Sequence, residues 1–161
     1  TRMENTPLLT EHLNLSRLVS GEILPFESVA FEHKVSLQCC ISPDIQIHGN
    51  SSQIKQLVSI LLDNAIQYTE KERLISISLT KNRNFARLSV CNPGKEIPPE
   101  RRSKLFDRFY RLDDARSSDD SGTHYGLGLA IAKTITESHK GRIFVLCPDG
   151  LVEFRVEIPI L

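Results

Sequence analysis

The apolar positions between residues 51 and 68 recur at the spacing of an amphipathic α-helix. They fall three or four residues apart, at Ile54, Leu57, Val58, Leu61, Leu62, Ala65 and Ile66. Residues 16–33 show a weaker helical period, with Ser16 as the expected N-cap and Pro25 expected to kink or interrupt the helix. A third helix is expected over residues 126–139 and a short one over residues 99–106.

Alternation of apolar and polar residues predicts strands in most of the remaining chain. Residues 74–80 and 85–90 alternate like a β-hairpin around a turn at residues 81–84. The other expected strands are residues 8–15, 35–41, 45–48, 142–146 and 152–158, the last two joined by a turn at Gly150. The predicted fold is one α/β (α+β) sandwich over residues 1–161, with about three helices on one face of a mixed, largely antiparallel sheet.

Composition and charge are those of an ordinary globular domain. Apolar residues make up 40% of the chain, charged residues 25%, and 20 Lys and Arg balance 20 Asp and Glu. We therefore expect no nucleic-acid partner and no direct membrane contact from this chain. No stretch approaches the roughly 18 apolar residues of a membrane-spanning helix. The four cysteines lack metal-binding spacing and are expected to be reduced thiols that act as small hydrophobic residues.

Asn64 lies at the edge of the apolar stripe of the 51–68 helix, with Ile60 and Tyr68 one turn to either side. A core-facing amide without hydrogen bonds costs about 1–3 kcal/mol. Bonding to a neighbouring backbone group would satisfy it. An amide oxygen is also a suitable ligand for Mg²⁺, which usually meets proteins through one or two oxygens.

Gly126 and Gly128 open the helix expected at residues 126–139, directly after the polar segment 111–125. Free N–H groups and the helix dipole at such an end can hold phosphate oxygens, and glycine lets a phosphate approach closely. Glycines also simply end loops. The pattern is neither a dinucleotide-binding motif nor a P-loop, because no strand precedes it and no Gly-Lys-Ser/Thr follows it.

Two further segments have simple structural explanations and also fit a phosphate ligand. Residues 90–98 contain a Pro/Gly turn at a strand end. Residues 105–111 combine aromatic and basic side chains just before the polar segment. The aromatic residues there can anchor the core, which leaves Arg108 or Arg111 free to reach phosphate.

In this order and at these distances, the four features resemble the catalytic domain of sensor histidine kinases, a member of the gyrase, chaperone, kinase and mismatch-repair ATPase superfamily. Residues 61–69, Leu-Leu-Asp-Asn-Ala-Ile-Gln-Tyr-Thr, resemble the N box. Residues 106–111 resemble the F box and residues 126–129 the second glycine box, while residues 92–98 occupy the place of the first glycine box. The match runs from about Leu15 to Pro159, nearly the whole chain.

The resemblance implies a protein histidine kinase that binds ATP and Mg²⁺ under a flexible lid at residues 111–125. It implies that Asn64 binds Mg²⁺, that Asn92 accepts from the adenine amino group, and that Arg108 or Arg111 approaches the phosphates. The other ATP-binding residues carried over by the match are Tyr68, Gly94, Ile97, Tyr110, Gly126, Leu127, Gly128 and Leu129.

The γ-phosphoryl group would pass to a histidine on the protein's own dimerisation and phosphoacceptor domain, and a response regulator would be the next partner. None of the five histidines lies in an H-E-x-x-x-P context, so we expect the phosphoacceptor hairpin upstream and no autophosphorylation by this chain alone. The resemblance further implies a cytoplasmic domain of a membrane-anchored bacterial sensor protein.

Several residues depart from the family pattern. Ile60 stands where the kinases usually carry another Asn, Glu96 replaces a glycine, and Asn92 replaces an Asp. Val152 occupies a position that is usually Thr or Ser, so the amide NH₂ of Asn92 is expected to lack an acceptor there, and adenine recognition to be weakened. These departures leave open a nucleotide-binding pseudokinase. An anti-sigma-factor serine kinase of the same superfamily is the other alternative, although the F box and long lid disfavour it.

Overall fold

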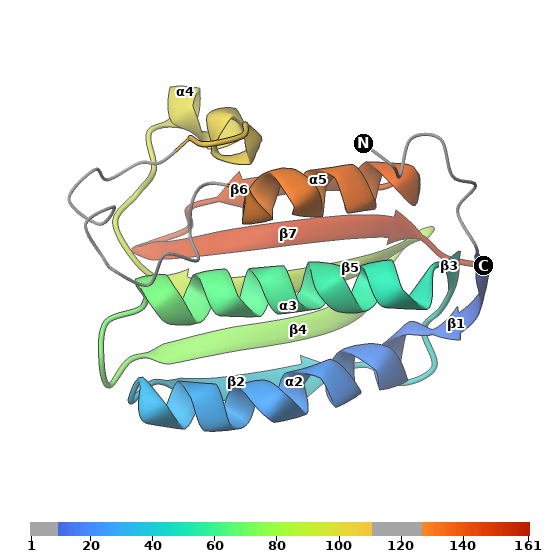
Figure 1. The fold of residues 1–161 in the computed structure, drawn as a ribbon, viewed down its shortest axis with the longest axis horizontal. Helices are drawn as coiled ribbons and strands as arrows, with labels where there is room; N and C mark the ends of the chain where they lie inside the picture. The colour runs from blue at the N-terminus through green and yellow to red at the C-terminus, as the bar shows by residue number, and fades with distance from the viewer. Residues whose placement is uncertain (1–9, 111–126) are drawn as a thin grey trace.

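The structure is a computed structural model that describes residues 10–110 and 127–161. Figure 1 shows strands and helices arranged in two layers. The elements are β1 (Glu11–Asn14), α2 (Leu15–Glu32), β2 (Ser36–Ile41), β3 (Gln46–Gly49), α3 (Ser51–Tyr68), β4 (Leu74–Asn82), β5 (Phe85–Pro93), α4 (Pro99–Arg102), the 3₁₀ turn η1 (Ser103–Phe106), α5 (Gly128–Ser138), β6 (Arg142–Leu146) and β7 (Leu151–Pro159).

Five strands form the main sheet in the order β2-β4-β5-β7-β6. Strand β2 runs parallel to β4, and the other three neighbouring pairs are antiparallel. Strands β1 and β3 form a separate antiparallel pair at one end of the domain. The predicted mixed, largely antiparallel sheet is therefore confirmed.

Helices α2, α3 and α5 cover one face of the main sheet, as predicted, and α4 is a short fourth helix at its edge (Figure 1). The apolar stripe of α3 is buried, and so are the alternate residues of the strands beneath it. On β4 these are Ile75, Ile77 and Leu79, each at most 1% exposed. The core thus lies between this sheet face and the three helices.

The far ends of α3 and α5 are joined by one histidine. The backbone N–H of Asn50 donates to Nε2 of His139 at 3.0 Å, and Nδ1 of the same ring donates to the carbonyl oxygen of Ile135 at 2.8 Å. A Cβ on Gly49 would lie 2.8 Å from the His139 ring, so glycine is required there. These contacts hold α5 in place along α3.

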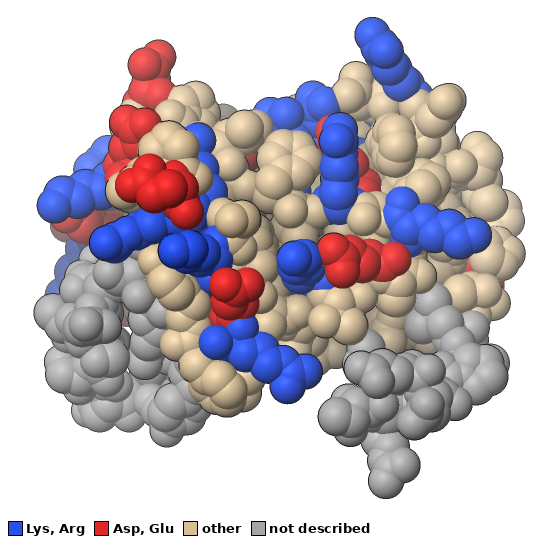
Figure 2. Space-filling model, turned by 90° about the horizontal axis from the view of Figure 1, so that it is seen from above, with Lys and Arg blue, Asp and Glu red and all other residues tan. Residues whose placement is uncertain are grey.

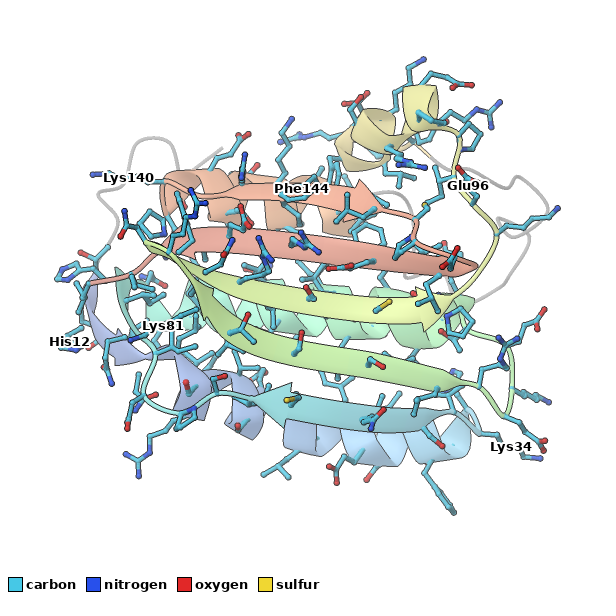
Figure 3. All side chains as sticks on the ribbon, turned by 180° about the vertical axis from the view of Figure 1, so that it is seen from behind. His12, Lys34, Lys81, Glu96, Lys140 and Phe144 are labelled. Carbon is cyan, nitrogen blue, oxygen red and sulfur yellow. The ribbon has the colours of Figure 1, made fainter. Side chains whose placement is uncertain are left out.

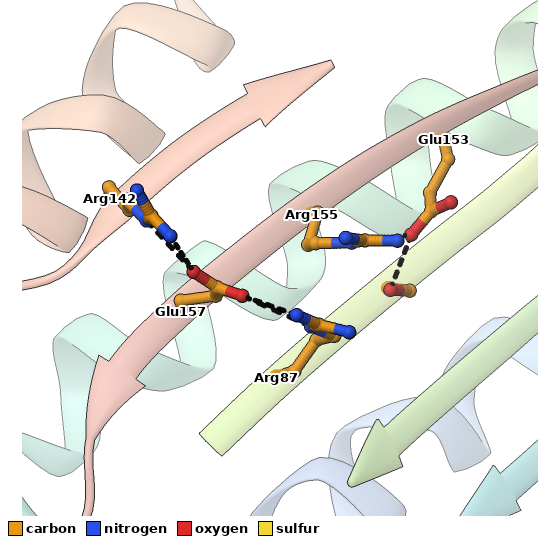
Figure 4. Close-up of polar contacts among 6 residues, drawn as sticks. Arg87, Arg142, Glu153, Arg155 and Glu157 are labelled. Atoms are coloured by element: carbon orange, nitrogen blue, oxygen red, sulfur yellow. Dashed lines mark hydrogen bonds and ion pairs between the residues drawn. The ribbon is translucent and has the colours of Figure 1, made fainter. Parts of the chain in front are cut away.

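The opposite face of the main sheet carries polar side chains rather than a second layer (Figure 3). On this face Glu157 is only 2% exposed and lies between Arg87 and Arg142, with N–O distances of 2.9 and 2.8 Å (Figure 4). Burial raises the pKa of Glu157, but hydrogen bonds and positive charge from the two arginines outweigh burial and lower the pKa below its ordinary 4.5. The carboxylate therefore stays ionised beneath its arginine partners.

The predicted N-cap of the first helix is wrong, and so is the predicted interruption at Pro25. Asn14, not Ser16, is the N-cap, because its side chain accepts from the backbone N–H of Arg17. Ser16 is buried and links two segments instead, donating to Ser42 O and accepting from Ile45 N. Helix α2 also runs without interruption through Pro25, which is exposed, so the carbonyl it leaves unbonded can meet water.

Other element boundaries differ slightly from prediction. The expected 99–106 helix divides into α4 and the 3₁₀ turn η1, and within the described part α5 begins at Gly128. The expected lid, residues 111–125, lies outside the described residues. All four cysteines are free thiols, but Cys39 and Cys40 are exposed rather than buried. Among the described helices, none is long and apolar enough to cross a bilayer.

Candidate functional site

The described candidate residues come from one end of the domain. The C-terminal end of α3, the C-terminal end of β5, the N-terminus of α5 and the start of β7 all lie at the left of Figure 1, below α4. Helix α3 contributes Asn64 and Tyr68, β5 contributes Asn92, and α5 contributes Gly128. Residues of different elements that lie 24 to 64 positions apart in sequence are thus placed around one corner.

Asn64 is half-buried in the fourth turn of α3. Within the described residues its side-chain amide forms no hydrogen bond, so the backbone contact considered as an alternative is not there. An amide oxygen that is partly shielded and uncommitted suits a hard cation such as Mg²⁺. The donor set is sparse, because no cluster of three His, Cys, Asp or Glu occurs in the described chain. A metal here would rely on this one oxygen together with ligand oxygens.

Within the described residues, no side chain caps the N-terminus of α5. Its first intrahelical bond runs from Ile131 N to Leu127 O at 2.9 Å, which leaves the N–H groups of Gly128, Leu129 and Ala130 without helical acceptors. The N-cap is Leu127. Uncapped N–H groups at the positive end of the helix dipole favour phosphate.

Ile60 connects the two helices at this corner. A Cβ placed on Gly128 would lie 3.5 Å from Cγ2 of Ile60, so the two residues are neighbours across the α3–α5 interface. Asn64 follows Ile60 by one helical turn on the same face of α3. The amide is therefore close to the open end of α5, but an apolar side chain occupies the position beside it.

Asn92 ends the core-facing row of β5 and is 5% exposed. Its Nδ2 donates to the carbonyl oxygen of Pro93 at 2.8 Å, so the expectation that its NH₂ lacks an acceptor is wrong. Val152 lies opposite on β7 and offers no polar atom. The free polar atom of Asn92 is consequently Oδ1, for which the described residues provide no donor.

Gly94 lies in the turn after β5 and packs close to Asn92. Its N–H donates to Gly150 O at 3.1 Å, which ties the turn after β5 to the turn before β7. A Cβ on Gly94 would meet Cγ2 of Val152 at 3.2 Å and Nδ2 of Asn92 at 3.6 Å. A larger residue would press on both neighbours.

Ile97 is held through both of its backbone groups by side chains that the sequence did not single out. Its N–H donates to Sγ of Cys147 at 3.4 Å, and its carbonyl oxygen accepts from Nε of Arg102 at 2.9 Å. Arg102 also pairs with Glu96 at 3.3 Å. Glu96, which stands where the family has a glycine, thus lies in a turn that Cys147 and Arg102 hold through the backbone groups of Ile97. No sequence signal separates Arg102 from its neighbour Arg101.

The segment after Ile97 attaches to the core through η1. None of the four residues of α4 is buried, whereas Phe106 packs edge-on against Phe154 with ring centroids 6.1 Å apart. Tyr110 is half-buried against the core, and Phe109 is 66% exposed.

Arg108 is exposed, and among described residues its side chain forms no ion pair. Figure 2 shows basic and acidic side chains interspersed on the face that carries α4, α5 and β6.

The structure thus places Asn64, Tyr68, Asn92, Gly128 and Leu129 on elements that meet at this end of the domain. Gly94 directly follows β5, Ile97 lies shortly before α4, Tyr110 follows η1, and Leu127 directly precedes α5. Arg111 and Gly126 lie outside the described residues. A family model described as "Histidine kinase-, DNA gyrase B-, and HSP90-like ATPase" matches residues 49–161. The chain belongs to this ATPase family.

Similar proteins place the domain more closely within the ATPase family. Sensor protein DltS of Streptococcus agalactiae is 40% identical over 148 residues, which are 92% of this chain and 37% of DltS. Sensor histidine kinase CusS of Escherichia coli strain K12 is 33% identical over 158 residues, 97% of this chain and 32% of CusS. The solved catalytic domain of histidine kinase ThkA matches with a TM-score of 0.83 at 28% identity, covering 94% of this chain and 96% of that one.

The fold of this ATPase-family chain is therefore that of histidine kinase catalytic domains. The chain spans about a third of the length of the curated relatives it matches, between 28% and 37% for the first four. It matches the solved ThkA catalytic domain over almost its whole length. Membership of the family implies ATP binding, which agrees with an α5 N-terminus and with amide oxygens of Asn64 and Asn92 that have no hydrogen-bond partner among the described residues.

Proposed function

We propose that this domain binds Mg-ATP and donates the γ-phosphoryl group to a histidine on the dimerisation domain of a two-component sensor kinase. The observation that carries the proposal is the pairing of the uncommitted amide of Asn64 on α3 with the uncapped N-terminus of α5. The first suits a cation and the second suits a phosphate, and Ile60 and Gly128 hold the two helices in contact. A metal–polyphosphate ligand needs both.

Each residue has a definite part in this proposal. Oδ1 of Asn64 binds the metal, and the N–H groups at the start of α5 bind phosphate oxygens. Oδ1 of Asn92 accepts from the adenine amino group, and Ile97 supplies an apolar wall. When bound, Mg²⁺ neutralises charge on the phosphates. The protein's contribution is then positioning and charge stabilisation. Tyr68, Tyr110, Leu127 and Leu129 are proposed to line the same ligand.

The transfer itself requires a histidine from outside this domain. An imidazole nitrogen forms a bond to the γ-phosphorus while the bond from that phosphorus to the bridging oxygen breaks, and ADP leaves. Arg108, which is exposed and unpaired among the described residues, is available to the leaving phosphates. We propose that the parent protein is a membrane-anchored bacterial sensor and that a response regulator receives the phosphoryl group next, as histidine kinase ThkA has been solved in complex with a response regulator protein.

The test mixes this domain with the helical phosphoacceptor hairpin from its own full-length protein and Mg-ATP. We expect phosphate on the hairpin that is labile in acid and stable in alkali, and none when either part is omitted. The variant Asn64→Ala should lose transfer and Mg²⁺-dependent binding, while Asn82→Ala, at the far end of β4, should keep both. If the domain binds Mg-ATP but transfers no phosphate, the kinase proposal is overturned in favour of a pseudokinase. Acid-stable phosphoserine on a partner would instead indicate a serine kinase.

A specific observation favours the pseudokinase as the second candidate. Ile60 contacts the start of α5 at the position where these kinases usually carry a second amide, and isoleucine cannot bind metal. The change Ile60→Asn therefore separates the two functions. A gain of at least about tenfold in transfer rate without a matching change in ATP affinity would show that the native residue limits turnover.

A further inference from the structure

Two exposed histidines face each other across the small β1–β3 sheet. His12 on β1 lies directly opposite His48 on β3. Both side chains are exposed, while the alternate pair, Leu13 and Ile47, is buried beneath them. The histidines therefore share the outer face of the sheet, at the opposite end of the domain from the nucleotide corner (Figure 1). Figure 3 labels His12 at that end.

The hydrogen-bonding register brings these two side chains close together. Leu15 N donates to Ile45 O at 2.8 Å, which marks that opposite pair as hydrogen-bonded. Pairs alternate along an antiparallel ladder, so His12 and His48 form a non-hydrogen-bonded pair. The backbone of Gln46 supports this assignment, because its carbonyl oxygen points away from β1 and accepts from Leu161 N at 3.1 Å. Such pairs have Cα atoms about 4.5 Å apart and the closest side chains of the ladder.

The protonation of His12 suits a metal ligand. Its Nε2 lies 2.9 Å from Oε1 of Gln46, and since a carbonyl oxygen only accepts, Nε2 carries the proton. In the neutral form of this ring, Nδ1 of His12 is then the nitrogen with the free lone pair. Metal-binding histidines usually donate their second N–H to an oxygen in this way, which fixes the ring. The ring of His48 forms no hydrogen bond within residues 10–110 and 127–161.

We infer that His12 and His48 form a bidentate site for a divalent transition-metal ion of the Zn²⁺, Ni²⁺ and Cu²⁺ class, oriented by Gln46. Imidazole nitrogens favour these ions over Mg²⁺. No third His, Cys, Asp or Glu joins the pair in the described chain, so water completes the coordination and the site exchanges metal readily. A bound ion would tie β1 to β3 and so stabilise the domain with rising metal concentration. The inference is independent of the proposed kinase function.

Zinc titration of the metal-free domain tests the site by calorimetry and by ¹H–¹⁵N spectra of the histidine rings. The background variant carries Cys39→Ser and Cys40→Ser, so that these exposed thiols do not compete. We expect one Zn²⁺ per chain, with the ring signals of His12 and His48 shifting together. His12→Ala and His48→Ala should each lower the affinity by at least about tenfold, because either removes chelation, and Gln46→Ala should lower it about tenfold through the lost outer hydrogen bond.

The matched control is His33→Ala. His33 is also exposed and also uses one ring nitrogen, with Nδ1 3.0 Å from Val29 O, but it lies at the end of α2 without a facing histidine. It should leave zinc affinity unchanged. Wild-type affinity in His12→Ala or in His48→Ala would overturn the site, and so would ring signals that respond at different zinc concentrations. Mg-ATP affinity, measured on the same variants, should not change, so failure here leaves the proposed function untouched.

Discussion

The side-chain amide of Asn92 donates to the carbonyl oxygen of Pro93 at 2.8 Å, and this contact determines which polar atom of the side chain remains as an acceptor. Reversing the amide would place two oxygens against each other. Oδ1 is therefore fixed as an acceptor in a residue that is 5% exposed. An acceptor matches the amino group of adenine and opposes the carbonyl oxygen of guanine. In the proposed nucleotide site, Asn92 would thus offer adenine a neutral acceptor of fixed orientation.

The first prediction is that restoring the family's usual Asp at position 92 weakens ATP binding. A carboxylate oxygen would replace Nδ2 and lie against Pro93 O, so one hydrogen bond becomes a repulsion. The net loss is about 1 kcal/mol, or roughly fivefold in Kd. Calorimetry should show this loss in Asn92→Asp and at least about tenfold preference for Mg-ATP over Mg-GTP in the wild type. Tighter ATP binding by Asn92→Asp, or equal binding of the two nucleotides by the wild type, would contradict the orientation.

The second prediction separates packing from phosphate binding at Gly128. A Cβ there would make an ordinary contact of 3.5 Å with Ile60, so the fold should accept Gly128→Ala with an unchanged or slightly higher Tm. If phosphate lies on the first turn of α5, the added methyl blocks its approach. We expect ATP affinity to fall at least about tenfold, as for the loss of a charge-assisted contact, while adenosine affinity stays the same.

The control for Gly128 is Gly21→Ala on α2. Gly21 is exposed and a Cβ added there would meet no neighbouring atom within 4 Å, so alanine should raise stability by up to about 1 kcal/mol without affecting nucleotide binding. If Gly128→Ala lowers the Tm by several degrees and reduces the affinities for adenosine and ATP equally, the glycine is needed for packing rather than for phosphate binding.

The third prediction concerns Arg102, which holds the Ile97 carbonyl at 2.9 Å. Replacing it with Met keeps much of the volume but frees the turn that carries Ile97. Affinity for ATP and ADP should fall by the same factor, about threefold to tenfold, because the adenine end is affected and the phosphate end is not. Arg101→Met is the control, since Arg101 is exposed and its side chain has no partner within the described residues.

The contact with Glu96 should contribute little to the role of Arg102. Glu96 is 70% exposed and the pair spans 3.3 Å, so Glu96→Gln should change affinity by less than about twofold. A larger loss in Glu96→Gln than in Arg102→Met would assign the fixing of the turn to the ion pair. A change in the ratio of ADP to ATP affinity in Arg102→Met would move its role to the phosphates.

Local periodicity predicted the elements far better than their pairing. The limits of α3 and β6 agree with the sequence prediction because their apolar positions repeat without interruption. The placement of β2 parallel to β4, and of β3 in another sheet, depends on contacts between distant residues that no local pattern encodes. The turn of Ser42, Pro43 and Asp44 joins these two sheets, and its residues would look the same in a hairpin.

Some residues of the candidate site could likewise be predicted from local sequence, and others could not. Asn64 and Gly128 were predictable because a polar residue beside an apolar stripe and a glycine at a helix start are anomalies that require a physical reason. The roles of Pro93 and Arg102 were not predictable, because one acts through a backbone carbonyl and the other lies beside an equivalent Arg101. Only the folded geometry distinguishes them from their neighbours.

The last prediction concerns Glu157, whose carboxylate lies between Arg87 and Arg142 on the open sheet face. Glu157→Gln removes the charge that both arginines bind. Arg87 and Arg142 keep 29% and 70% exposure and can turn to water, so we expect a loss of about 1–3 kcal/mol in the free energy of unfolding at pH 7. Urea unfolding of the two proteins measures it.

The pH dependence of this difference follows from the lowered pKa of Glu157. Its unfolded pKa lies at the ordinary 4.5 and its folded pKa below that, so the ion pairs stabilise the fold fully above pH 4.5. Their contribution disappears as pH falls through the folded pKa, where the wild-type side chain becomes neutral like glutamine. The difference in unfolding free energy between wild type and Glu157→Gln should therefore be constant from about pH 7 to 5.5 and disappear below 4.5.

The control is Glu137→Gln, at an exposed position on α5. It should show no such difference at any pH, because no described residue pairs with Glu137. A difference for Glu157→Gln that persisted unchanged into strong acid would mean that packing, rather than ionisation, makes Glu157 stabilising.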